Sequence, residues 1–122
     1  MCVGTGGWQG GALKKLKEQG IKCVGIDYHN LKQKSPGNFV QADAHALPFA
    51  DASFKFVVSQ GMFDENFYKN DVNTILLEVC RVLEPGGIFS GHTIYISDLS
   101  DEVKERFTLG SSGVTVTYMI KK

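Results

Sequence analysis

The stretch MCVGTGGWQGG (Met1–Gly11) opens the chain and carries five glycines. The apolar residues Met1–Val3 precede the first glycine. The segment Trp8–Gln19 follows it, with alanine and leucine on one helical face and lysines on the other. A strand, a glycine turn and a helix in this order let backbone N–H groups approach a ligand at the start of the helix. The stretch therefore predicts a ligand-binding turn at the edge of a sheet.

Strands and helices alternate along the rest of the chain. Apolar, β-branched runs predict strands at Ile21–Asp27, Phe39–Asp43, Phe54–Gln60, Ile88–Ile96 and Gly113–Ile120. Apolar residues recur at helical spacing between Asp71 and Leu83, and a short helix capped by Ser97 or Asp98 is expected to run through Phe107. This alternation predicts an α/β fold in which a parallel sheet is covered by helices, with ligands bound where the strands end.

The composition suits one soluble domain over residues 1–122. Basic and acidic residues number 13 each, so no bulk basic charge points to a nucleic-acid partner. No apolar run reaches the ~18 residues of a membrane span, and no leader pattern is present. Three widely spaced cysteines favour neither a disulfide framework nor a metal site. We therefore predict a cytoplasmic protein with no membrane contact and no metal.

Four segments in this order resemble the class I S-adenosylmethionine-dependent methyltransferases, closest to the small-molecule branch that includes quinone-pathway enzymes. They are VGTGGWQGG, VGID ending at Asp27, ADAHALPFADASFKFVVS and LLEVCRVLEPGGIF, and the resemblance covers residues 1 to about 90. It implies a Rossmann-like three-layer sandwich with a mostly parallel sheet. It also implies S-adenosylmethionine as the cofactor and a small molecule as the methyl acceptor.

The resemblance assigns parts of the cofactor to residues of this chain. Asp27 would accept both ribose hydroxyls, and it follows Gly7 by 20 positions, as expected of a nucleotide-binding βαβ unit. The other implied contacts are Gly4, Thr5, Gly6 and Gly7 for the methionine carboxylate, Asp43 and Ala44 for the adenine edge, Tyr28 and Leu47 for the adenine faces, and Ser59 and Gln60 for the methionine part. An oxygen or nitrogen acceptor also needs a base, for which His45, His92 and His29 are unranked candidates.

The chain departs from the family pattern at several points. Cys2 stands at the position of the family's first glycine, and Lys55 stands where an aspartate is common. We expect a minimal fold, apparently truncated at both ends, without N-terminal lid helices and with only part of the C-terminal hairpin. The short first strand leaves neighbouring backbone groups without partners, which favours a homodimer.

The sequence is compatible with three functions. The first is an active methyltransferase, and the second is a non-catalytic module that binds S-adenosylmethionine or S-adenosylhomocysteine within an assembly. The third, a nicotinamide-dinucleotide domain, requires a third glycine at the sixth position of the loop, where this chain has Gln9. The four motifs favour the first.

Overall fold

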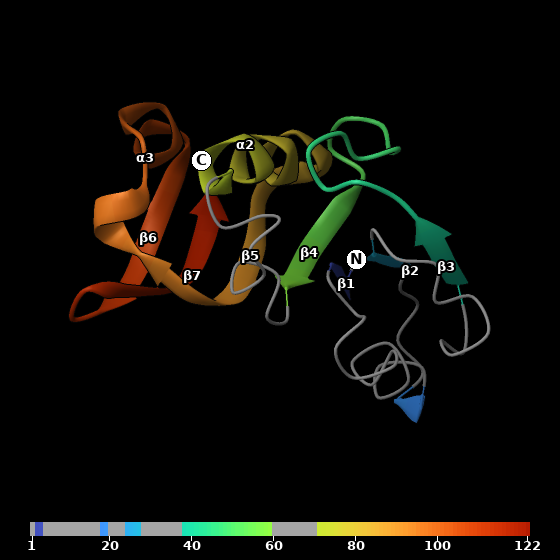
Figure 1. Cartoon of the computed structure of the whole chain (residues 1–122), viewed down its shortest axis with the longest axis horizontal. Coiled ribbons are helices and arrows are strands. Elements are labelled where there is room, and N and C mark those ends of the chain that lie inside the picture. The colour runs from blue at the N-terminus through green and yellow to red at the C-terminus, as the bar shows by residue number, and fades with distance from the viewer. Residues whose placement is uncertain (1, 4–17, 20–23, 28–37, 60–70) are drawn as a thin grey trace.

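The computed structural model describes residues 2–3, 18–19, 24–27, 38–59 and 71–122 (Figure 1). Its strands are β1 (Cys2–Val3), β2 (Val24–Asp27), β3 (Asn38–Gln41), β4 (Phe54–Ser59), β5 (Leu83–Tyr95), β6 (Phe107–Ser112) and β7 (Thr115–Lys121). Its helices are α2 (Val72–Val82), the 3-10 turn η3 (Ile96–Asp98) and α3 (Asp101–Arg106). The segment predicted as a helix at Trp8–Gln19 lies outside the described residues except for Glu18 and Gln19.

The described strands form one mixed sheet in the order β3-β2-β1-β4-β5-β7-β6. Neighbours from β3 to β5 run parallel, whereas β7 runs antiparallel to both β5 and β6. The chain moves outward from β1 to β3 on one side, then returns to β4 on the other. Strand order therefore reverses between β1 and β4, and this is the point where open α/β sheets bind their ligands.

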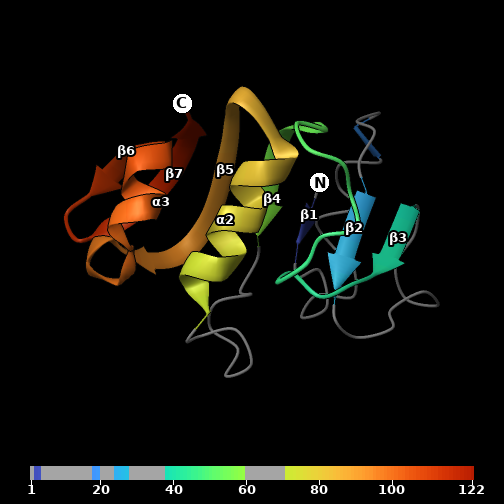
Figure 2. The same cartoon turned by 90° about the horizontal axis from the view of Figure 1, so that it is seen from above.

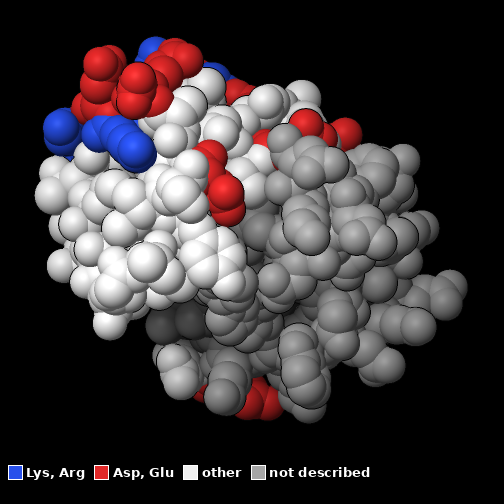
Figure 3. All heavy atoms as spheres, turned by 60° about the vertical axis from the view of Figure 1, so that its left-hand side comes forward, with Lys and Arg blue, Asp and Glu red and all other residues white. Residues whose placement is uncertain are grey.

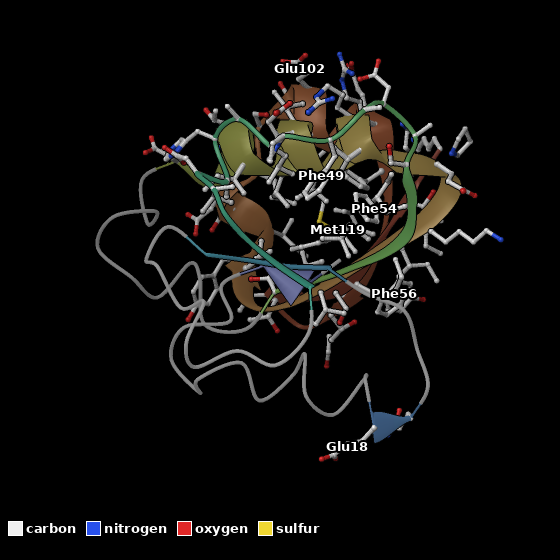
Figure 4. The ribbon with its side chains drawn as sticks, turned by 90° about the vertical axis from the view of Figure 1, so that its right-hand side faces the viewer. Glu18, Phe49, Phe54, Phe56, Glu102 and Met119 are labelled. Carbon is white, nitrogen blue, oxygen red and sulfur yellow. The ribbon has the colours of Figure 1, made fainter. Side chains whose placement is uncertain are left out.

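Helices α2 and α3 lie on the same face of the sheet (Figure 1). Seen from above, α2 crosses the β4–β5 region and α3 lies beside β6 and β7 (Figure 2). An apolar core lies between these helices and the sheet. Its fully buried large side chains are Val57, Ile75, Leu76, Val79, Val82, Leu83, Phe89, Val103, Phe107 and Met119. Phe49 and Phe54 lie beneath α2, with their rings edge-to-face at 5.1 Å between centroids, while Phe56 points away from the helix (Figure 4).

The predicted helix at 71–83 is confirmed, with α2 beginning after Asp71 and ending at Val82. Its apolar stripe is buried because that stripe faces the sheet. The predicted strand at 88–96 begins earlier, since Leu83 already pairs with Phe54. The register then shifts, and Gly86 has a φ of 83°, a conformation that suits glycine. The EPGG segment therefore forms the irregular start of β5.

The expectation that part of the C-terminal hairpin is missing is wrong. Residues Phe107–Ser112 form β6, which pairs with β7 along its whole length, so both hairpin strands are present. The helix before it is shorter than expected and is capped at Ser100, whose Oγ accepts a hydrogen bond from the Val103 N–H at 3.3 Å. Helix α3 ends before Phe107, because Phe107 is the first residue of β6 and its side chain is buried there.

Acidic and basic side chains lie next to one another at one end of the molecule, over α3 (Figure 3). Arg106 pairs with Glu102 across one helical turn at 3.0 Å, with both side chains more than half exposed. Such a pair adds little to stability. No helix among the described residues is long and apolar enough to cross a membrane.

Candidate cofactor site

The site begins where four neighbouring parallel strands end. In the sheet register, Val3 of β1 lies opposite Ile26 of β2 and Ser59 of β4. Asp27, the last residue of β2, pairs with Gln41, the last residue of β3. The carboxyl ends of β3, β2, β1 and β4 therefore form one continuous edge across the reversal point. The positions of Asp27, Asp43 and Ser59 lie at or just beyond this edge, as the strand pattern predicted.

The loop that follows β3 is shaped by Asp43. Its Oδ1 accepts a hydrogen bond from the backbone N–H of His45 at 2.9 Å, and its carbonyl oxygen accepts one from Ala46 at 3.0 Å. An aspartate side chain that binds the backbone two residues ahead forms an Asx turn. The turn buries Ala44, yet it leaves 42% of the Asp43 side chain exposed. The carboxylate is thus fixed in place and still accessible to a ligand.

The imidazole of His45 lies between two carboxylates. Its Nδ1 is 2.5 Å from Asp43 Oδ1, and its Nε2 is 2.8 Å from Oδ2 of Asp71, the residue that precedes α2. The hydrogen bonds to Asp43 and Asp71 raise the pKa of His45 above its usual value. Partial burial alone would raise the pKa of Asp43, but its hydrogen bonds with His45 outweigh that effect and lower it.

The other end of the loop is held by Arg81 in the last turn of α2. Its Nη2 donates to the Leu47 carbonyl at 2.8 Å, and its Nη1 donates to the Phe49 carbonyl at 2.7 Å. Its Nε donates to Glu78 Oε2 at 2.7 Å, and Glu78 Oε1 accepts the Leu47 N–H at 2.9 Å. Hydrogen bonding to Arg81 and Leu47 lowers the pKa of Glu78, so the carboxylate stays ionised. Helix α2 therefore holds the loop at both ends.

Ser59 is the last residue of β4, next to the reversal point. It is 3% exposed, and its hydroxyl has no hydrogen-bond partner among the residues that the structure describes. Buried hydroxyls in native proteins are nearly always paired. Within the described part of the chain, the Ser59 Oγ at the strand end therefore fits a site in which a bound polar group completes its hydrogen bonding.

The remaining predicted site residues divide into three groups. Leu47 belongs to the buried core, at 4% exposure, so little of its surface is open to an adenine ring. Asp27 and His92 lie in β2 and β5, where the structure describes the backbone but not these side chains. Those outside the described residues are Gly4, Thr5, Gly6, Gly7, Tyr28, His29 and Gln60.

Three residues that hold the loop, one directly before α2 and two within it, could not be identified from the sequence. Asp71 was interpreted only as the helix start, although its side chain makes no capping hydrogen bond and binds His45 instead. Glu78 and Arg81 lie three positions apart on the polar side of the predicted helix, a spacing typical of a surface ion pair. The pair was visible in the sequence, but its backbone partners on the loop were not.

The strand order and its reversal point define a Rossmann-like α/β fold. Comparison with known proteins gives the family. The family model described as a methyltransferase domain matches residues 1–91. The chain belongs to this methyltransferase family. The cofactor of the chain is S-adenosylmethionine.

Individual relatives agree with this assignment. A demethylmenaquinone methyltransferase of Lactococcus lactis is 36% identical over 98 residues, which are 71% of this chain and 37% of the relative. This chain therefore spans well under half the length of that enzyme. A putative methyltransferase from Haloferax volcanii, solved in complex with the Trm112 methyltransferase activator, is 33% identical, with a TM-score of 0.61 over 74% of this chain and 42% of that one. A protein from Pyrococcus horikoshii shares the fold, with a TM-score of 0.73 at 20% identity over 99% of this chain and 80% of that one.

Proposed function

We propose that this chain transfers a methyl group from S-adenosylmethionine to a small-molecule acceptor in the cytoplasm, with residues 1–122 acting as one cofactor-binding domain. The observation that carries the proposal is the Asp43 carboxylate. It lies two residues beyond Gln41, which ends β3 opposite Asp27 of β2; it is fixed by its own turn and remains 42% exposed. An ionised carboxylate accepts hydrogen bonds only, which suits the amino group of adenine.

The proposed roles of the other residues follow from their positions. Asp27 at the end of β2 would accept the ribose hydroxyls, and the Gly4–Gly7 turn would receive the methionine carboxylate. Ser59, whose buried hydroxyl has no partner among the residues that the structure describes, would bind a polar group of the methionine part. When bound, S-adenosylmethionine supplies an activated methyl carbon. The residues of this chain then contribute mainly by alignment of the acceptor, an effect that reaches about 7–11 kcal/mol in well-oriented systems.

The acceptor class rests on the lactococcal relative, whose name specifies demethylmenaquinone. We propose an acceptor of this small-molecule type. We also propose that the working unit is a homodimer, and the Haloferax volcanii complex shows that a methyltransferase of this fold can instead pair with an activator protein.

Two titrations test the proposal. Isothermal calorimetry with S-adenosylhomocysteine should show binding to the wild-type chain, and Asp43→Ala should weaken it by about tenfold or more, the loss of a charge-assisted hydrogen bond. Reduced nicotinamide cofactor should not compete. Absence of binding at millimolar ligand would contradict the proposal.

A radiolabel assay separates the enzyme from the non-catalytic module. Labelled S-adenosylmethionine is incubated with the chain and demethylmenaquinone, and the extracted quinone is counted. Transfer above a protein-free control supports the enzyme. Binding without transfer to this acceptor or to a panel of small phenols and amines would favour the module.

A further inference from the structure

His45 connects two separate elements at the edge of the proposed adenine site. One ring nitrogen contacts Asp43 in the loop after β3, and the other contacts Asp71 at the start of α2, 26 positions further along the chain. The His45 side chain is 26% exposed, against 42% for Asp43 and 47% for Asp71. The two contacts therefore form a partly buried bridge rather than an exposed pair.

The bridge fixes the charge of the ring. An ionised carboxylate only accepts hydrogen bonds, and a neutral imidazole carries one N–H donor and one acceptor nitrogen. Both ring nitrogens of His45 face carboxylate oxygens, so both contacts require an N–H on each nitrogen. The geometry is that of an imidazolium, and loss of one proton breaks one of the two contacts.

The side chain of Asp71 contributes to this bridge instead of capping α2. It occupies the position immediately before α2, where an aspartate ordinarily accepts a hydrogen bond from the first turn. Here the side chain makes no such bond, and its Oδ2 binds His45 instead. The carboxylate is used to hold the adenine-site loop rather than to cap the helix.

We propose that His45 is a positioning residue for the cofactor: as an imidazolium it holds the Asp43 carboxylate in place against α2, so that cofactor binding weakens when His45 loses its proton. The inference rests on the proposed role of Asp43 in adenine binding. It removes His45 from the candidates for a catalytic base, because the ring is committed to two carboxylates on the protein.

The direction of the pH effect follows from the groups that face His45. Asp43 from the loop and Asp71 from α2 raise its pKa, so the bridge is complete below the ordinary histidine range and is lost as pH rises through the raised pKa. The pKa of Asp43 is lowered, so its side of the bridge fails only in acid. Further along α2, Glu78 and Arg81 hold the other end of the loop, and their shifted pKa values keep both charged from pH 5.5 to 8.

The test is the pH dependence of S-adenosylhomocysteine affinity, measured by calorimetry between pH 5.5 and 8. The wild-type affinity should fall by about two- to fivefold as pH rises, the size expected of a partly exposed ion pair. His45→Gln, which cannot titrate, should give a flat profile. Asp71→Asn should flatten it as well, because an amide can donate to a neutral ring and remove the need for the second proton. Glu102→Gln, on the exposed face of α3, removes a carboxylate elsewhere and should keep the wild-type profile.

The outcomes distinguish a failure of the proposed adenine site from a failure of the proposed role of His45. No binding by the wild-type chain at any pH, or unchanged binding by Asp43→Ala, overturns the proposed adenine site. Binding with the same pH profile in wild type, His45→Gln and Asp71→Asn overturns the role of His45 alone. Should His45→Gln unfold, the Asp71→Asn profile and the imidazole titration of the wild-type chain by nuclear magnetic resonance decide the question. A ring pKa at or below the ordinary value would contradict the bridge.

Discussion

Replacing Arg81 with alanine should loosen the loop that follows β3. The guanidinium donates to the Leu47 and Phe49 carbonyls and pairs with Glu78. Asp51, the fourth partner, is 79% exposed and contributes little. The alanine variant leaves two loop carbonyls and a partly buried carboxylate without their cation.

The expected size follows from these contacts. A hydrogen bond from a charged donor contributes about 1.5–3 kcal/mol when well buried. Because 32% of the Arg81 side chain is exposed, we take about 1–1.5 kcal/mol, at or just below the bottom of that range, for each of the two carbonyl bonds and less than about 1 kcal/mol for the ion pair. The sum predicts a loss of about 2–4 kcal/mol in the free energy of unfolding. For a chain of this length that corresponds to a fall of about 8–16 °C in Tm.

Urea denaturation followed by circular dichroism measures this loss. Arg106→Ala is the matched control, since Arg106 pairs only with the exposed Glu102 among the described residues and should cost less than about 0.5 kcal/mol. Arg81→Lys should fall between the two, because an ammonium cannot reach both carbonyls and Glu78 in the fork geometry of a guanidinium. Equal stabilities of Arg81→Ala and Arg106→Ala would refute the view that α2 holds the loop through Arg81.

Two further substitutions test the fold around the site. Ser100→Ala removes the Oγ that caps α3 and should cost about 1 kcal/mol by urea denaturation, whereas Ser100→Asp should cost little; equal effects would contradict the cap. Gly86→Ala should cost about 1 kcal/mol, since φ is 83° while the space around an added Cβ is open; a neutral result would mean that the start of β5 adopts another conformation.

Local patterns predicted the elements that carry a strong period. Helix α2 was predictable because its apolar residues repeat at helical spacing, and β7 because β-branched residues alternate in TVTYMIK. Strand β6 was not, because FTLGSS contains a glycine and small polar residues with little strand preference. Its state comes from pairing with β7, where Gly110 lies directly against the Tyr118 ring.

The candidate site also combines features that the sequence predicts with features that depend on tertiary packing. The sequence predicted that Asp43 would be the last residue of a strand; β3 instead ends at Gln41, paired with Asp27, so Asp43 lies two residues beyond the strand end. The contacts that fix it depend on tertiary structure, since His45 reaches Asp71 and Arg81 reaches Leu47 only after α2 has packed against the sheet. Side-chain partners so far apart in sequence follow from packing and not from any local period.

We propose that S-adenosylmethionine binds at the carboxyl edge of β3, β2, β1 and β4. Nuclear magnetic resonance titration of the ¹⁵N-labelled chain with S-adenosylhomocysteine tests it most directly, because each backbone amide reports separately. We expect large shifts at Asp43, Ala44 and Ser59, with the amides of α3 and β6 nearly unchanged. Saturable binding whose shifts fall on β6 and β7 and spare Asp43 and Ala44 would contradict it.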